Sequence, residues 1–295
     1  MTKLMCAFGL VLLCASCAST GYTYRRAYEP GETYRYKMVR TYNENGEFKR
    51  EEVAESVHQV PGEGSLRERI QFVKLTKRTS EGTEDLSEAI AAFPPYEASM
   101  AAVDDPDALT LPDIKGWDMG VVGPVTDLHT FLVAVSPQIG AQKVDRPGKM
   151  FGHTNGVKGD WSNGESILVG EDCIRTAVTL VEVTTQTAVY ETTFLPPLSA
   201  CLEMLKPWME APVVEGTPNN FQQHMDMGGM HAVMWGREEF TVRSKVRRSD
   251  GLILSATMDN PLTLKLKVGC DAALDSCKVE LPMKIHRKLT LELIQ

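Results

Sequence analysis

The sequence predicts a mainly β protein, in which a large curved antiparallel sheet or half-open barrel is covered by one amphipathic helix over residues 125–135. Residues 240–293 alternate apolar and polar side chains, which is the period of strands with one buried and one solvated face. Asn45-Gly46 and Asp250-Gly251 separate such runs, and these dipeptides favour tight hairpin turns because they tolerate positive φ. Together these patterns predict consecutive antiparallel strands.

The first part of the chain predicts short elements separated by clear turn signals. The apolar face of the third run switches near Phe72-Val73, which indicates a β-bulge, and Pro94-Pro95 ends the helical pattern before it. The predicted elements are a strand over 34–38, a returning strand through Val53 and Val57, a third strand over 66–75 and a short helix over 86–92.

One longer helix is predicted over 125–135, where apolar residues recur at helical spacing. Pro124 suits the first position of a helix, and Pro137 ends the pattern because it lacks the N–H that the helix needs. His129 falls outside the apolar stripe, so we expect it on the surface. The stripe is wide enough for the helix to lie across a sheet.

The second half of the chain predicts strands almost throughout. We expect the loose halves 31–164 and 165–295 to share one continuous sheet, as a single β-rich domain over 31–295, because neither half alone closes its edges. The predicted strands cover 174–183 and 188–195, followed by four consecutive antiparallel strands over 240–246, 252–258, 262–268 and 279–293.

Residues 1–17 have the layout of a secretory signal peptide. Lys3 supplies the positive start, residues 7–13 form a short apolar run, and Ala15-Ser16 is a small-residue exit. Cys17 follows directly. This order resembles the processing site of bacterial lipoproteins, a family in which the signal is cut before the cysteine and the cysteine receives acyl chains.

The resemblance implies a lipid anchor at Cys17 and a tether over 18–30. The sequence departs from the family at Cys14, where the family usually has Leu. Because Ala18 stands where an aspartate would mark retention in the inner membrane, the resemblance implies an exported protein of the cell envelope, anchored in the outer membrane of a two-membrane cell.

Four cysteines remain after the leader: Cys173, Cys201, Cys270 and Cys277. An even set fits disulfides in an oxidising compartment, and three pairings are open. Sequence proximity favours Cys270–Cys277 and Cys173–Cys201. A four-thiolate metal site is disfavoured because no Cys-x-x-Cys pair is present.

Charge and motifs argue against several classes of function. The net charge is −8 and the only basic cluster is 245–248, so no nucleic-acid partner is expected. The chain has no Gly-x-Ser-x-Gly, His-Glu-x-x-His or phosphate-binding glycine motif. We therefore expect a non-catalytic protein, with an uncharacterised enzyme as the third alternative.

The stretch 224–234 is rich in histidine and methionine, and thioethers with imidazoles suit copper. A periplasmic copper-binding protein is therefore the second interpretation. Methionines also fill gaps in ordinary cores, so these residues could equally begin a buried strand. The candidate ligands are His224, Met225, Met227, Met230 and His231.

A curved sheet crossed by one helix resembles the half-open barrels of envelope lipid and lipoprotein carriers, at the level of architecture alone. The resemblance implies a non-catalytic lipoprotein that binds a hydrophobic ligand or a partner protein at the membrane surface. The competing interpretation is an ordinary dry core made by the same residues. The inward residues that would line a cavity are Val242, Leu254, Leu264, Leu281, Leu289 and Leu291.

Overall fold

The computed structural model describes residues 22–101, 109, 111–114, 116–135, 147–148, 150–154, 167–168, 175–195, 197–226 and 229–294. The predicted leader, Cys17 and Cys173 therefore lie outside the described residues. The described elements are β1 (Thr33–Glu44), β2 (Glu47–Gln59), β3 (Glu68–Thr79), β4 (Thr83–Asp85), α1 (Ser87–Ala91), β5 (Tyr96–Ala98), α2 (Met119–Ala134), β6 (Met150–Thr154), β7 (Ile167–Leu168), β8 (Arg175–Val183), β9 (Thr187–Leu195), η2 (Pro207–Met209), β10 (Phe221–Asp226), β11 (His231–Glu238), β12 (Thr241–Arg247), β13 (Ile253–Cys270) and β14 (Val279–Leu293).

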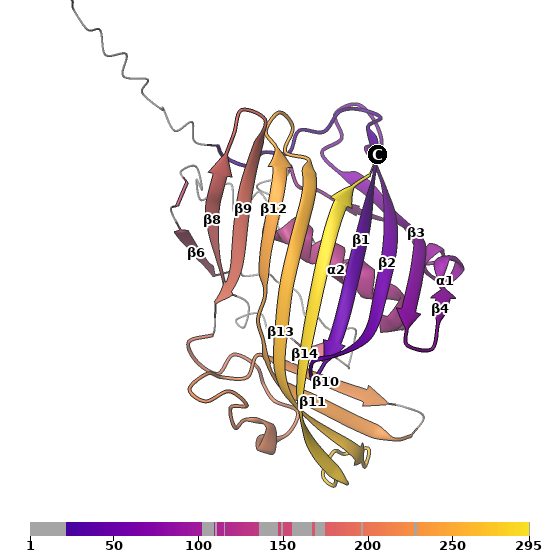
Figure 1. Ribbon diagram of the computed structural model, residues 1–295, viewed down its shortest axis with the longest axis vertical. Coiled ribbons are helices and arrows are strands. Elements are labelled where there is room, and N and C mark those ends of the chain that lie inside the picture. The colour runs from indigo at the N-terminus through magenta and orange to yellow at the C-terminus, as the bar shows by residue number, and fades with distance from the viewer. Residues whose placement is uncertain are drawn as a thin grey trace, which may run out of the picture.

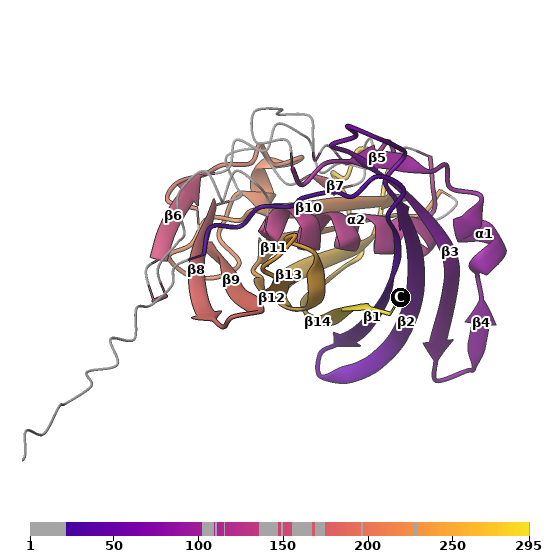
Figure 2. The same ribbon diagram turned by 90° about the horizontal axis from the view of Figure 1, so that it is seen from above.

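The strands form one 14-stranded sheet with the main order β4-β3-β2-β1-β14-β13-β12-β9-β8-β6. Figure 1 shows this sheet as one broad surface, and Figure 2 shows that it curves around α2. The predicted class, a mainly β protein with a large open antiparallel sheet and few helices, is confirmed. No helix in the described part of the chain is long and apolar enough to span a bilayer.

β13 is one strand of 18 residues, where the sequence predicts two strands, over 252–258 and 262–268. Three strands, β12, β13 and β14, therefore stand where the sequence predicts four. Pro261 does not break β13 because it lies between two partners on the same edge: β12 pairs as far as Asp259, and β11 pairs from Leu262. At this gap, Glu239 N donates to Pro261 O (3.0 Å), so no ladder bond requires the N–H that proline lacks.

α2 begins six residues before the predicted helix, at Met119. Asp118 caps it, since its Oδ1 accepts a hydrogen bond from Gly120 N (2.6 Å). Pro124 consequently lies inside the helix and not at its first position. His129 is buried, contrary to the expectation of a surface histidine, and burial lowers its pKa to about 4.

The main core lies between α2 and the inner face of the sheet, and a buried ion-pair cluster crosses it. Arg40 on β1 binds Glu52 on β2 (Nε to Oε2, 2.7 Å) and Asp127 on α2 (Nη1 to Oδ2, 3.0 Å). All three side chains are buried, so each charge depends on its partners. The Arg40 guanidinium lies so close to Gly123 that a Cβ there would be 2.7 Å from Nη2. The cluster thereby fixes where the helix crosses the sheet.

The predicted tether over 18–30 needs correction where the structure describes it. Residues 22–32, which we call the strap, have no regular secondary structure but pack on the body across the ends of the strands (Figure 2). Tyr24 and Arg26 are buried there. The aromatic side chains that interrupt the polar tether composition gain contacts with the core, so this part is not a free linker.

We expect Gly123→Ala to destabilise the protein, although alanine normally favours a helix over glycine. The new methyl group must displace a guanidinium that two carboxylates hold, and overpacking of this kind costs about 1–3 kcal/mol. Urea unfolding followed by circular dichroism measures the change. Gly62→Ala, where a Cβ meets nothing within 4 Å, is the control; equal stability of the two variants would contradict the close approach.

Candidate functional site

The six residues predicted to line a cavity do not form one group. Val242, Leu289 and Leu291 are buried in the main core with α2. Leu264 is buried in a separate cluster with Phe221, Leu262 and Ile285. The prediction of one lining for all six residues is therefore wrong.

Leu254 and Leu281 differ from the expectation for local reasons. At a bulge, Lys245 pairs with Ser255 and Val246 with Ile253, so Leu254 is the extra residue and is only partly buried. Leu281 lies beyond the covered part of the sheet and is 47% exposed. It lies near the end of β13 and the start of β14, where it pairs with Leu266.

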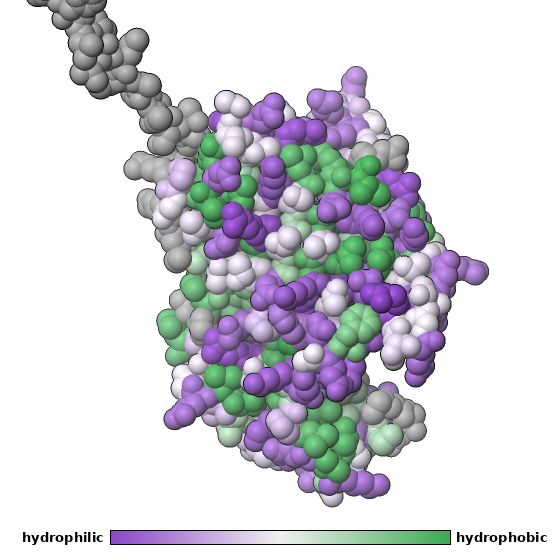
Figure 3. All heavy atoms as spheres, in the orientation of Figure 1, coloured by the Kyte–Doolittle hydropathy of each residue, from purple (hydrophilic) through white to green (hydrophobic). Residues whose placement is uncertain are grey.

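At this end the inner face of the sheet continues past its cover. Leu266 pairs with Leu281 and Val268 with Val279, in register with the pair of buried Leu264 and partly buried Met283. Figure 3 shows hydrophobic side chains gathered over the lower end of these two strands. β10 and β11 extend the sheet beyond β13 at this end. The large apolar residues on this side of β10, β11, β13 and β14, which we call the tip face, are Met225, Met234, Leu266, Val268, Val279, Leu281 and Met283.

The opposite side of the same strands is covered. Trp235 and Val233 on β11 are buried there with Met209 and the disulfide-bonded Cys270. Trp208 packs edge-on against Trp235, with ring centroids 5.0 Å apart, and Lys267 Nζ lies 3.6 Å from the Trp208 ring. The tip is therefore a small layer with one packed side and one side that exposes apolar residues.

The disulfide Cys270–Cys277 closes the β13–β14 loop, as sequence proximity predicts. It ties together the strand ends that carry the tip face. Cys201 is also disulfide-bonded. Since Cys173 lies outside the described residues, the predicted pair Cys173–Cys201 stays a prediction.

The five candidate metal ligands are only partly brought together. His224 Nε2 lies 3.2 Å from His231 Nδ1 across the β10–β11 hairpin. Met225 points to the other side of the hairpin, because neighbours on a strand face opposite ways. Met230 is exposed, and Met227 lies outside the described residues. In the described part of the chain, no three His, Cys, Asp or Glu side chains are grouped as a metal site.

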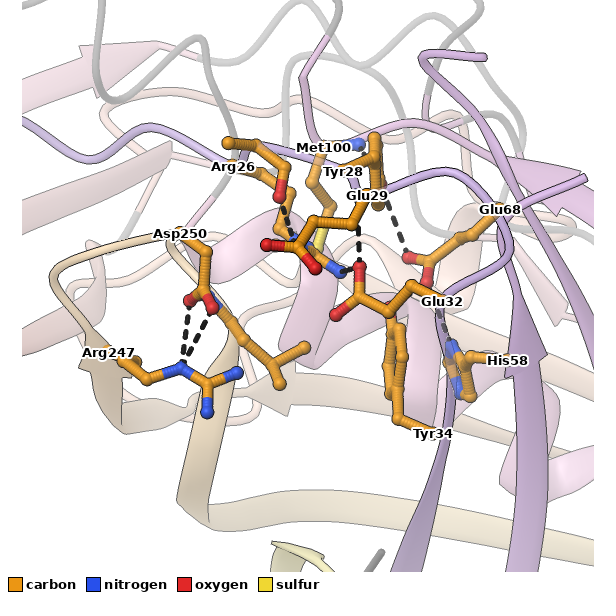
Figure 4. A network of polar contacts seen from close by, with 12 residues as sticks. Arg26, Tyr28, Glu29, Glu32, Tyr34, His58, Glu68, Met100, Arg247 and Asp250 are labelled. Carbon is orange, nitrogen blue, oxygen red and sulfur yellow. Dashed lines mark hydrogen bonds and ion pairs between the residues drawn. The ribbon is translucent and has the colours of Figure 1, made fainter. Parts of the chain in front are cut away.

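Sequence reasoning missed a buried polar cluster at the strap end of the sheet (Figure 4). Ser56 Oγ lies 3.0 Å from His58 Nε2, and His58 Nδ1 lies 3.2 Å from Glu68 Oε2. Tyr34 donates to the same carboxylate oxygen. Ser56 and His58 occupy positions of β2 whose side chains point into the core. Polar residues at the inward positions of an alternating strand are the sequence pattern that could have revealed the cluster.

The order serine, imidazole, carboxylate matches that of a hydrolase triad, but the electrostatics do not favour catalysis. Burial lowers the pKa of His58 to about 3 and raises that of Glu68 to about 8, so both groups are neutral near pH 7. Ser56 is only 2% exposed, so a substrate cannot reach it in this conformation. The cluster is a polar part of the core, and its strongest feature is a carboxyl group held in its protonated form.

No protein-family model and no curated protein matches the chain. The chain is similar to a solved structure described as lipid–protein interactions in lipovitellin, with a TM-score of 0.46 and 10% identity over 91% of this chain. It spans about a quarter (26%) of the length of that structure. OmpT, an outer membrane protein of Vibrio cholerae, aligns over 91% of this chain and 99% of its own length, with a TM-score of 0.14 and 7% identity.

Proposed function

We propose that this protein is a non-catalytic lipoprotein of the cell envelope that binds a hydrophobic ligand or a partner protein through its tip face. The observation that carries the proposal is the row Leu266–Leu281 and Val268–Val279, which continues the apolar inner face. Val279 and Leu281 are exposed, and their partners Leu266 and Val268 are only partly buried. Soluble proteins rarely expose contiguous apolar surface unless it meets a ligand, a partner or a membrane.

The tip face supports this proposal better than the main core does. In the main core, α2 fills the inner face and its side chains are buried against the strands, so the residues that were expected to line a cavity contact protein instead. At the tip the same face of the same strands has nearly half-exposed side chains at Val279 and Leu281, beside partly buried methionines. Methionine adapts its shape to irregular apolar ligands.

Leu281→Asp together with Val279→Asp should weaken binding of a fluorescent fatty acid, cis-parinaric acid, by about tenfold or more. Each substitution replaces roughly half-buried apolar contact with charge, and about 1.4 kcal/mol corresponds to a factor of ten. Fluorescence titration of the full chain measures the affinity, and mass spectrometry identifies lipids that copurify. Val181→Asp, which changes an exposed valine on β8, is the control. Equal affinity of both variants, or no binding by the unchanged protein, would refute lipid binding by the tip face and leave only a protein partner.

The lipid anchor rests on the leader and on Cys17. Cys17→Ser should release the protein from the membrane fraction, because the serine hydroxyl does not replace the thiol that receives the acyl chain. Fractionation followed by immunoblotting measures the distribution. Ser19→Ala should remain membrane-bound; if Cys17→Ser also stays in the membrane fraction, the anchor is refuted.

Copper binding is the second candidate, favoured by the 3.2 Å contact between the two imidazole nitrogens. Two nitrogens at that separation can meet one copper ion after small side-chain rotations. Calorimetric titration with Cu(I) and with Cu(II) should show one saturable site that His224→Gln abolishes. His286→Gln, at an exposed histidine on β14, should leave it intact. The absence of saturable binding in the unchanged protein would end this candidate.

A further inference from the structure

The strap is attached to the body at a few points along its length. Tyr190 on β9 donates its hydroxyl hydrogen to Tyr22 O (3.1 Å), and Ala27 N donates to Asp250 O in the β12–β13 turn (2.7 Å). Gly31 N donates to Val60 O after β2 (3.2 Å). The strap thus bridges strands from distant parts of the sheet while making no continuous ladder with any of them.

The strap also covers one end of the main core. Tyr24 is buried there with its ring edge-on to Tyr190, the centroids being 6.2 Å apart. Beneath it, Tyr36 donates to Ile253 O (2.8 Å). If the strap lifts, these aromatic side chains meet solvent, and the end of the core becomes accessible from outside.

A further attachment of the strap converges on Glu68, the first residue of β3 (Figure 4). Tyr28 of the strap donates to its Oε1 (3.4 Å), and the hydroxyl oxygen of Tyr28 accepts a hydrogen bond from Met100 N (3.0 Å). The titratable and charged groups around Glu68 are Tyr24, Arg26, Tyr28 and Glu32 from the strap, Tyr34 from β1, His58 from β2 and Tyr96 from β5.

The strap contributes one positive charge to this cluster, Arg26, and Glu32 of the strap pairs with it. Nη2 of Arg26 lies 2.8 Å from Glu32 Oε2, and the guanidinium lies over the Tyr28 ring, 4.3 Å from the centroid. The positive charge is thus engaged within the strap. Burial raises the pKa of Glu68 more than the nearby Arg26 charge lowers it, and the carboxyl group contacts the His58 imidazole and the hydroxyl groups of Tyr28 and Tyr34.

We propose that the strap is a reversible latch, closed over the protonated Glu68 carboxyl group and released when that group ionises. The closed state keeps a neutral carboxyl group in a buried, aromatic site. Lifting the strap exposes this group to water, where its charge is solvated. Ionisation and opening therefore favour each other, and the core end becomes accessible above neutral pH.

The direction of the pH effect follows from both buried groups. Glu68 has a folded pKa of about 8 against an ordinary 4.5, so closure loses stability as pH rises from 4.5 to 8. His58 has a pKa of about 3 against 6.5, so closure loses stability as pH falls from 6.5 to 3. The two effects cancel between pH 4.5 and 6.5. Above 6.5 the Glu68 effect remains alone, and opening should increase about tenfold by pH 9.

Hydrogen exchange of the full chain, followed by mass spectrometry at pH 5.5, 6.5, 8 and 9, tests the latch. After correction for the intrinsic pH dependence of exchange, protection of the Ala27 and Gly31 amides should fall about tenfold between pH 6.5 and 9. Protection of the β13 amides, which report opening of the sheet itself, should not fall in parallel. Strap protection that stays within twofold over this range overturns the proposal.

Two matched variants test whether the pH dependence of strap protection comes from Glu68. Glu68→Gln keeps a neutral side chain of the same shape, so its strap protection should be the same at pH 6.5 and 9. Glu32→Gln removes a strap carboxylate that binds Arg26, so protection should be lower at every pH while the tenfold fall remains. A pH dependence that survives in Glu68→Gln overturns the proposal; if that variant does not fold, the series on the unchanged protein decides.

Discussion

The length of β13 constrains most of this structure. Its 18 residues pair with β14 along one edge, while the other edge is shared in succession by β12 and β11. The body and the tip are therefore parts of one sheet joined by a continuous strand and not two units joined by a linker. Pro261 marks the point where one partner on that edge replaces the other, and a missing N–H costs little there.

Because side chains alternate without interruption between β13 and β14 beyond this point, the face that is buried in the body is the same face that is exposed at the tip. The difference lies in what covers it. α2 covers the body, and no described element packs over Val279 and Leu281. The candidate binding surface is thus a consequence of strand length: the strands extend further than the helix that covers them.

Much of this architecture was predictable because it depends on local patterns. Alternation predicts the strands, Asn45-Gly46 adopts the positive φ values that its turn requires, and the bulge predicted near Phe72-Val73 is present where β2 and β3 shift register. The candidate sites were harder. Leu254 alternates with its neighbours, and only the register of β12 against β13 shows that it is the extra residue of a bulge. His58 and Glu68 are ten residues apart, and only strand pairing makes them contacts.

The strap was missed for a related reason: its composition resembles a linker, and its order comes from contacts with residues far along the chain. The two buried polar clusters explain why the two ends of the core behave differently. Under α2, Arg40 has one carboxylate partner on β2 and another on the helix. Separating the helix from the sheet would therefore leave buried charges without a partner. Under the strap, His58 and Glu68 are neutral, and exposing them to water lets either one gain charge favourably. The helix is thereby fixed by ion pairs, whereas the strap rests on groups whose ionisation favours its release.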